Sequence, residues 1–109
     1  MKYHVKIADD ALKDYGELLT YICNQSPAGG KAWATAVDEV LGSIESNPFQ
    51  FGLIPERERI LVQYREAFFK TRKGKRYRIV FAVEESLVAI LYIRGPGQDF
   101  IDREPLRLP

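Results

Sequence analysis

Three segments with the pattern of strands, joined by very short links, constrain the fold of this chain most strongly. The segments span residues 64–72, 76–83 and 87–94, and the links are residues 73–75 and 84–86. Segments of this length that are rich in β-branched and aromatic residues favour strands. Links of three residues join antiparallel neighbours, because a parallel connection needs a crossover of a dozen residues or more. The second half of the chain is therefore predicted to form an antiparallel meander.

The chain begins with the pattern of one strand followed by one helix. Residues 3–7 alternate apolar and polar side chains, as a half-buried strand does. Apolar residues then recur at spacings of three and four up to about Asn24, which is the period of an amphipathic helix. Asp9 and Asp10 are the expected N-caps of this helix, because a carboxylate accepts hydrogen bonds from the free N–H groups of a first turn.

A second helix is expected directly after the first. Ser26 is the predicted cap and Pro27 the first helical residue, and the helix must end at Asn47 because Pro48 follows. So short a connection predicts that the two helices are antiparallel neighbours. Residues 48–63 show no clean period, and we expect a loop against the core with a short turn of helix around residues 56–61.

These elements predict an α+β fold in the order β-α-α-β-β-β. Two antiparallel helices are expected to pack on one face of a mainly antiparallel four-stranded sheet, within a single domain that spans residues 1–109. A chain of this length buries enough apolar surface for one core without a metal ion or a disulfide.

Composition excludes several classes of protein. Cys23 is the only cysteine, which rules out an intramolecular disulfide and a zinc site built from several cysteines. The longest apolar run, residues 87–93, is far shorter than the roughly 20 residues of a membrane span. We expect a cytoplasmic protein with no cofactor, no bound metal and no membrane partner.

Charge is segregated along the chain. Residues 1–54 hold four Lys, no Arg and seven acidic residues, whereas residues 55–109 hold three Lys, nine Arg and eight acidic residues. Six of the nine residues in the range 70–78 are basic, and an apolar run follows at once. Arginine is suited to bidentate contact with phosphate. The pattern predicts a hairpin that presents its basic tip and one face to a polyanion.

The basic cluster predicts binding to a polyanion, and catalysis does not follow from it. Cleavage of RNA without a metal would also need a base, an acid and cations that hold the charge developing on phosphorus. The candidate catalytic residues are Arg78, Arg72, Lys70, Arg94 and Glu66, and the candidate nucleic-acid-binding residues are Lys73, Lys75, Arg76 and Tyr77. Glu66 is the best carboxylate, although a salt bridge to Arg65 or Arg78 is its more ordinary role. His4, the only histidine, is expected to be a surface residue of the first strand.

Three pieces of the sequence together resemble the RelE/ParE superfamily of bacterial type II toxins. Residues 11–22 resemble the first helix of the family, with its Ala, Asp and Tyr-Ile positions, and residues 40–48 resemble a helix that ends in Asn-Pro. Residues 75–81 resemble the family's Tyr-Arg strand, which is followed here by a last strand that ends at Arg94 and Gly95. The resemblance covers nearly the whole chain and implies a toxin held inactive by a cognate antitoxin, in a toxin–antitoxin hetero-oligomer.

The resemblance implies two alternative targets. RelE-like members cut messenger RNA in the ribosomal A site, and ParE-like members inhibit DNA gyrase. Of the RelE-like site residues only Arg78 is matched: the two strand lysines fall on Phe69 and Thr71, with the charges one place off at Lys70 and Arg72. We predict ribosome-associated, metal-independent cleavage of messenger RNA. A gyrase inhibitor that is not an enzyme remains open, as does an inactive relative that survives as an antitoxin-binding partner.

The antitoxin itself is expected to bind through an acidic segment that is disordered when free. It would fold as a helix or an added strand across the sheet and the helix pair. Its apolar side chains are expected to cover surface left exposed in the irregular loop by Phe49, Phe51, Leu53 and Ile54.

Overall fold

The computed structural model describes residues 3–55, 63–72 and 74–96. The elements are β1 (His4–Ile7), α1 (Asp9–Gln25), α2 (Pro27–Ser46), the 3-10 turn η1 (Pro48–Gln50), β2 (Arg65–Phe69), β3 (Tyr77–Glu84) and β4 (Leu87–Arg94). Within these ranges the α+β class is confirmed, with two helices and one sheet of four strands. The turn of helix expected around residues 56–61 lies outside the described residues. No helix in the described ranges is long and apolar enough to cross a membrane.

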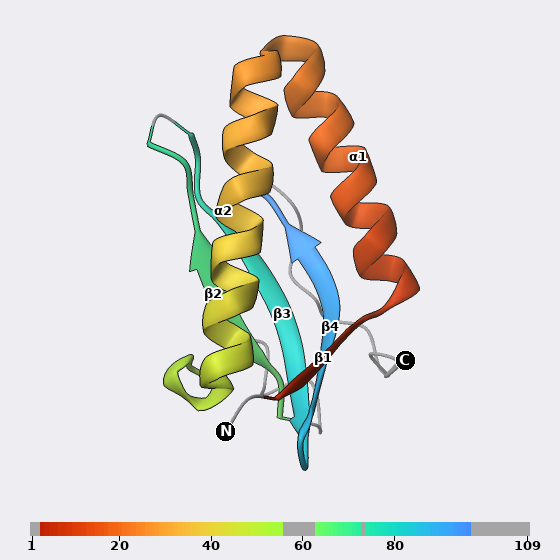
Figure 1. Cartoon of the computed structure of the whole chain (residues 1–109), viewed down its shortest axis with the longest axis vertical. Coiled ribbons are helices and arrows are strands. Elements are labelled where there is room, and N and C mark those ends of the chain that lie inside the picture. The colour runs from red at the N-terminus through yellow and green to blue at the C-terminus, as the bar shows by residue number, and fades with distance from the viewer. Residues whose placement is uncertain (1–2, 56–62, 73, 97–109) are drawn as a thin grey trace.

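The sheet is mixed, with the strand order β1-β4-β3-β2 (Figure 1). β2, β3 and β4 form the predicted antiparallel meander, and β1 joins β4 in parallel, with His4 beside Leu87. The parallel pair follows from the crossover, because the two helices carry the chain from β1 back across one face of the sheet. Figure 1 shows both helices on this face, α1 over β4 and α2 over β2 and β3.

The start of α1 differs from the prediction. Ala8, not an aspartate, is the N-cap, and it makes no side-chain capping bond. The reason is that the Ala8 N–H donates to the Ile90 carbonyl oxygen at 2.8 Å, so pairing with β4 continues up to the residue where the helix begins. Asp9 and Asp10 lie in the first turn instead, where their charges still interact favourably with the helix dipole.

One residue joins the two helices, as the sequence predicts. Ser26 closes α1 through its N–H, which donates to the Ile22 carbonyl at 2.9 Å. Its Oγ then accepts from the Gly29 N–H at 3.0 Å and caps α2, and Pro27 begins that helix. The end of α2 is also as predicted, since Asn47 is its C-cap and the Asn47 side chain accepts from the Phe49 N–H at 3.2 Å.

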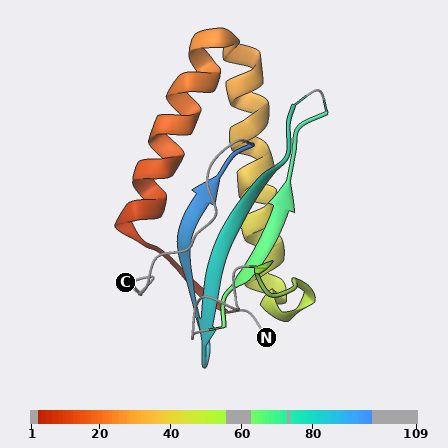
Figure 2. The same ribbon diagram turned by 180° about the vertical axis from the view of Figure 1, so that it is seen from behind.

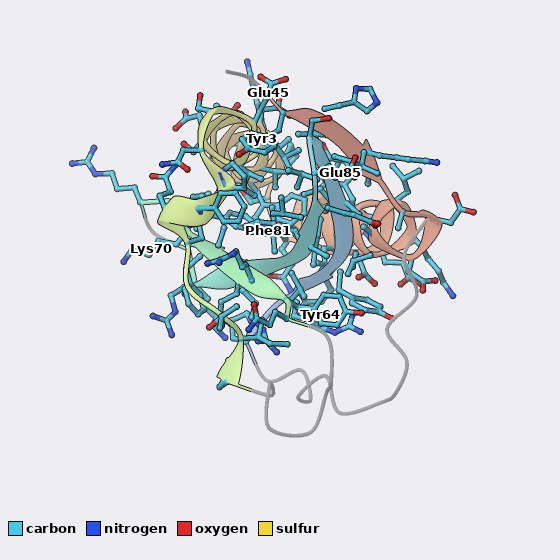
Figure 3. All side chains as sticks on the ribbon, turned by 90° about the horizontal axis from the view of Figure 1, so that it is seen from below. Tyr3, Glu45, Tyr64, Lys70, Phe81 and Glu85 are labelled. Atoms are coloured by element: carbon cyan, nitrogen blue, oxygen red, sulfur yellow. The ribbon has the colours of Figure 1, made fainter. Side chains whose placement is uncertain are left out.

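The main core lies between the helices and the sheet. Trp33 lies at its centre, against the rings of Tyr15, Phe69 and Tyr77. Viewed from below, Phe81 lies between the sheet and the helices (Figure 3). The buried residues of this core are Ala11, Trp33, Val37, Val40, Ile44, Ala67, Phe69, Ile79, Phe81, Val88, Ile90 and Ile93. Each large apolar side chain buried here contributes about 1.5–3 kcal/mol.

A second apolar cluster lies on the opposite face of the sheet, which Figure 2 turns toward the viewer. It joins Ile54 and Tyr64 to Val80 and Leu91, all of which are almost completely buried. The loop after α2 reaches this face because the Ile54 N–H donates to the Tyr64 carbonyl at 3.0 Å. Of the apolar residues in this loop, Ile54 is buried against the sheet, whereas Phe49 is exposed, as expected for part of the loop.

β2 is shorter than the predicted strand of residues 64–72. It ends at Phe69, which pairs with Tyr77, so Lys70 and Arg72 lie outside the ladder. One more pair in the same register would place Lys70 directly opposite Arg76. Like charges at directly opposite positions destabilise a sheet, and the ladder ends where this repulsion would begin.

A β-bulge in β4 decides which face carries Arg94. Val80 pairs with Tyr92 and Phe81 pairs with Ile90, so Leu91 is an extra residue on β4. A bulge of one residue reverses the alternation of side chains beyond it. Arg94 consequently pairs with Arg78 on the face opposite the helices, and without the bulge it would point into the main core.

The close approach of the helices near Ser26 gives a stability prediction. A Cβ atom at Gly30 would overlap the Sγ atom of Cys23 on α1. We expect Gly30→Ala to lower the free energy of unfolding by about 1–3 kcal/mol through overpacking, although alanine favours a helix. Gly42→Ala on the same helix is the control, because a Cβ there meets nothing within 4 Å, and it should gain about 0.5–1 kcal/mol.

Urea unfolding of both variants measures the difference. Cys23→Ala added to Gly30→Ala should recover part of the loss, because it removes the overlapping sulfur atom. Equal stabilisation by Gly30→Ala and Gly42→Ala would contradict the tight contact between α1 and α2.

Candidate functional site

Three arginines and two aromatic rings share the sheet face opposite the helices. We call this surface the arginine face, and it comprises Phe68, Arg76, Arg78, Tyr92 and Arg94. Phe68, Arg78 and Arg94 form one row, since Arg78 pairs with Phe68 on β2 and with Arg94 on β4. The structure thus brings together two of the predicted catalytic cations, from strands that are neighbours in the sheet.

Arg78 is held by a carboxylate of the neighbouring strand. Its Nη1 donates to Oε1 of Glu66 at 2.9 Å, and each side chain is only 13% exposed. This is the ordinary role that the sequence suggested for Glu66. Because the pair is largely shielded from water, its attraction is stronger than that of a surface salt bridge, and loss of one partner would leave a poorly solvated charge.

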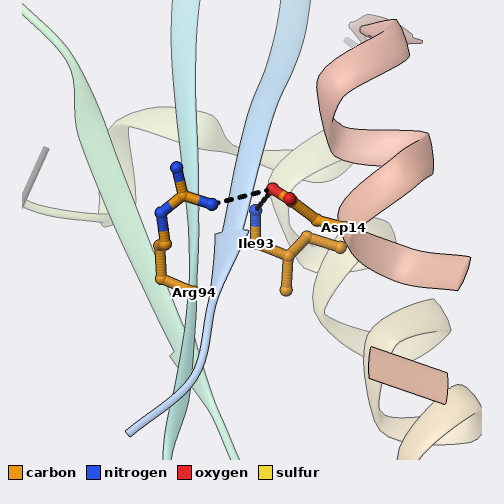
Figure 4. Close-up of polar contacts among 3 residues, drawn as sticks. All are labelled: Asp14, Ile93 and Arg94. Atoms are coloured by element: carbon orange, nitrogen blue, oxygen red, sulfur yellow. Dashed lines mark hydrogen bonds and ion pairs between the residues drawn. The ribbon is translucent and has the colours of Figure 1, made fainter. Parts of the chain in front are cut away.

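Arg94 is held by a carboxylate of α1 (Figure 4). Oδ2 of Asp14 accepts from Nη1 of Arg94 at 3.2 Å and from the Ile93 N–H at 3.0 Å. β1 has already ended at Ile7, so Asp14 replaces a neighbouring strand at this end of β4. Burial raises the pKa of the Asp14 carboxyl above its usual value, and this effect outweighs the hydrogen bond from Ile93 and the charge of Arg94, which lower it.

Two guanidinium groups also lie over aromatic rings. The Cζ atom of Arg76 is 4.2 Å from the centroid of the Phe68 ring, and that of Arg94 is 4.6 Å from the centroid of the Tyr92 ring. Such cation–π contacts contribute about 0.5–1 kcal/mol at exposed sites. Phe68 stays 45% exposed beneath Arg76, so a large apolar ring lies open among positive charges.

The connection between β2 and β3 carries further cations. Lys70, Arg72 and Lys75 are exposed, and in Figure 3 the Lys70 side chain points away from the body of the protein. The Gly74 N–H donates to the Thr71 carbonyl at 3.2 Å, which closes the turn of this connection. Lys73, another predicted nucleic-acid contact, lies outside the described residues.

Two other candidates lie away from the arginine face. Tyr77 faces the helices, stacked on Phe69 with ring centroids 5.7 Å apart, and burial raises the pKa of its hydroxyl. His4 is exposed on β1, an edge strand that β4 and β3 separate from β2. Neither side chain is placed to exchange a proton with a phosphate held by Arg78.

Sequence reasoning missed Asp14 as a partner of Arg94. A signal was present, because Asp14 follows the buried Ala11 by three residues and precedes the half-buried Leu18 by four, so its carboxylate borders the buried stripe of α1. A carboxylate in such a position needs a hydrogen-bonding partner. Which partner it finds depends on the packing of α1 against β4.

The arrangement is better suited to binding than to proton transfer. Arg78 and Arg94 are both engaged by carboxylates of this chain, while the cations of the β2–β3 connection are exposed. Within the part of the chain that the structure describes, no group of three or more His, Cys, Asp or Glu side chains is placed to hold a metal ion. What the surface offers a partner is positive charge beside an exposed aromatic ring.

The raised pKa of Asp14 predicts how stability changes with pH. The folded state holds the Asp14 proton more tightly than the unfolded chain does, so raising the pH from the unfolded value near 3.8 through the folded pKa favours unfolding. Asp14→Asn lacks this titration. The wild type should therefore lose stability relative to Asp14→Asn across that window, and the difference should be constant at higher pH.

Urea unfolding midpoints measured between pH 3.5 and 7 test the prediction. Asp38→Asn, at an exposed position of α2, controls for the loss of a carboxylate elsewhere. A wild type that gains stability relative to Asp14→Asn as the pH rises would show that the ion pair with Arg94 outweighs the burial.

A known protein family matches most of this sequence. The family model described as "ParE toxin of type II toxin-antitoxin system, parDE" matches residues 5–100, which include every described helix and all but the first residue of the described strands. No curated protein matches the chain. Because the match spans far more than half of the sequence, this chain belongs to the ParE toxin family of type II toxin–antitoxin systems, within the RelE/ParE superfamily.

Proposed function

We propose that this toxin inhibits DNA gyrase by binding it, as the ParE-like branch of the superfamily does, and that it cuts no messenger RNA. The observation that carries the proposal is that two of the three arginines of the arginine face are ion-paired within this chain. Arg78 is paired with Glu66 and Arg94 with Asp14, at 2.9 and 3.2 Å. The membership of the ParE toxin family supports the same choice.

Cleavage of RNA makes demands that this arrangement meets poorly. Cations must be available to a phosphate, and a base must be able to take the proton of the attacking 2′-hydroxyl. One carboxylate oxygen of Glu66 already accepts from Arg78, and a phosphate that bound Arg78 would compete with that carboxylate. Binding to a protein target makes neither demand.

The surface that we assign to the target is the β2–β3 connection with its neighbouring ring. Arg72 and Arg76 are exposed there, and the Arg76 guanidinium lies over the exposed Phe68 ring. Arginine and aromatic side chains are enriched where proteins bind each other, and exposed charges of one sign accelerate association with a partner of opposite sign. Gyrase bound to DNA presents both protein and phosphate to such a surface.

Ribosome-associated cleavage of messenger RNA is the second candidate, and one observation favours it. The rings of Phe68 and Tyr92 lie on the same sheet face as Arg78 and Arg94. Aromatic rings beside guanidinium groups can stack on an unpaired base. In that case the base missing from the toxin would come from the ribosome.

Two assays with the purified toxin separate the candidates. In the first, purified gyrase supercoils a relaxed plasmid with and without toxin, and we expect supercoiling to stop and cleaved DNA to accumulate on the enzyme. In the second, the toxin is added to a translating extract, and we expect the messenger RNA to stay intact. Ribosome-dependent cuts with unaffected gyrase would establish the second candidate instead, and folded toxin inactive in both assays would indicate an inactive relative.

The contact surface is tested by two variants that each remove two exposed positive charges. Arg72→Ala with Arg76→Ala should raise the toxin concentration for half inhibition of gyrase at least tenfold, which corresponds to about 1.4 kcal/mol of binding free energy. Lys6→Ala with Lys31→Ala removes the same charge from β1 and α2 and should leave inhibition unchanged. Equal effects of the two double variants would mean that the connection contributes only general electrostatic attraction.

A further inference from the structure

The free edge of β1 offers unpaired backbone groups. β1 is the first strand in the sheet order, and only β4 pairs with it among the described residues. The N–H groups of His4 and Ala8 point toward β4, donating to the carbonyls of Ser86 and Ile90 at 2.8 Å. Because these directions alternate along a strand, the N–H and C=O groups of Val5 and Ile7 point outward. Among the described residues, no second strand pairs with this side of β1, although the edge is closed just before β1 begins, where the Tyr3 N–H donates to the Glu45 carbonyl at 3.0 Å.

Side chains on the two sides of this edge differ in chemistry. Val5 packs toward the main core, and Ile7, which follows it on the same side, is 37% exposed. His4 and Lys6 are exposed on the other side of the strand. The side chains of a strand added beside β1 would alternate between the two sides of the sheet. Those on one side would lie next to Ile7, where apolar residues fit, and those on the other side next to Lys6.

The other edge of the sheet is less open. The Glu66 N–H on the outer edge of β2 donates to the Gly52 carbonyl at 3.0 Å, and the Tyr64 carbonyl accepts from the Ile54 N–H. The loop of residues 52–54 thus covers the first part of β2, with Leu53 bridged to Arg65. β1 is the longer uncovered edge in the described parts of the chain.

A second copy of this chain fits the β1 edge poorly. In an antiparallel pair that joins Val5 of one copy to Ile7 of the other, Lys6 lies directly opposite Lys6 of the second copy. Like charges at opposite positions destabilise a sheet, and an edge lysine is a common guard against pairing between copies. An acidic residue at the facing position would instead be attracted to Lys6.

We propose that the β1 edge is a docking site for an extended segment of the cognate antitoxin, in which apolar and acidic residues alternate. The segment adds a fifth strand to the sheet beside β1. Its backbone bonds to Val5 and Ile7, its apolar side chains cover Ile7, and an acidic side chain faces Lys6. This inference depends on membership of the toxin family and is independent of the gyrase proposal, which is tested with the toxin alone.

Hydrogen exchange resolved by residue tests the added strand. The sample is the complex that copurifies when the toxin gene is expressed together with its antitoxin gene, compared with free toxin. The Val5 and Ile7 amides should exchange at least tenfold more slowly in the complex. The amides of His4, Lys6 and Ala8 should change little, because their N–H groups already point to β4. Unchanged exchange at Val5 and Ile7 would overturn the proposal. This holds if protection appears elsewhere, such as at Phe68, and also if no complex forms.

Charge reversal at Lys6 provides the second measurement. Lys6→Glu should weaken binding of the antitoxin at least tenfold and leave gyrase inhibition by the free toxin unchanged. Lys31→Glu, an equal reversal at an exposed position of α2, should not weaken it. Equal losses from both variants would indicate long-range attraction only. Protection of Val5 and Ile7 that grows with the concentration of free toxin would identify the occupant as a second copy and so reject the antitoxin assignment.

Discussion

The Asp14 carboxylate on α1 links the helix layer to the end of the sheet and to Arg94. β4 extends well beyond the point at which β1 ends, so its last residues have no strand on that side. Asp14 occupies the gap by accepting the Ile93 N–H, which ties α1 to the end of β4. The same oxygen accepts from Arg94 and thereby determines where that guanidinium lies. Helix position, strand end and arginine placement thus share one acceptor.

The parts of the fold that the sequence predicted are those encoded by neighbouring residues. The meander follows from three strand-like segments with very short links, and the break between the helices follows from Ser26 and Pro27. The Ser26 capping bond spans only three residues. The end of β2 at Phe69 was missed, because it depends on the pairing register: one more pair would set Lys70 against Arg76. The N-cap of α1 was missed because a tertiary contact of Ala8 with β4 overrides the preference of Asp9 for that position.

The candidate site depends on features that no short window reveals. Nothing in Leu91 or its neighbours resembles a bulge signal, yet the extra residue there transfers Arg94 to the face of Arg78. Asp14 and Ile93 are 79 residues apart in the sequence, so their contact is decided only by the finished packing. The grouping of Arg78 with Arg94 was expected. The ion pair of Arg78 with Glu66 was also suggested by the sequence. The ion pair of Arg94 with Asp14 was not.

The two paired arginines differ from arginines whose charge is available to a phosphate. A strand pair that carries opposed arginines can hold a phosphate when the neighbouring positions are neutral or basic. Here Glu66 and Asp14 are ion-paired with these two arginines, and the exposed cations Lys70, Arg72 and Lys75 lie in the β2–β3 connection.

The parallel pairing of β1 with β4 has a consequence for synthesis of the toxin. The two helices can associate as soon as they leave the ribosome, because their contacts are local. The first strand must wait, since its partner lies at residues 87–90. At about 5–20 residues per second, the interval is roughly 4–16 seconds. During that time the nascent chain has no completed sheet, and the cell that translates it is not yet exposed to a working toxin.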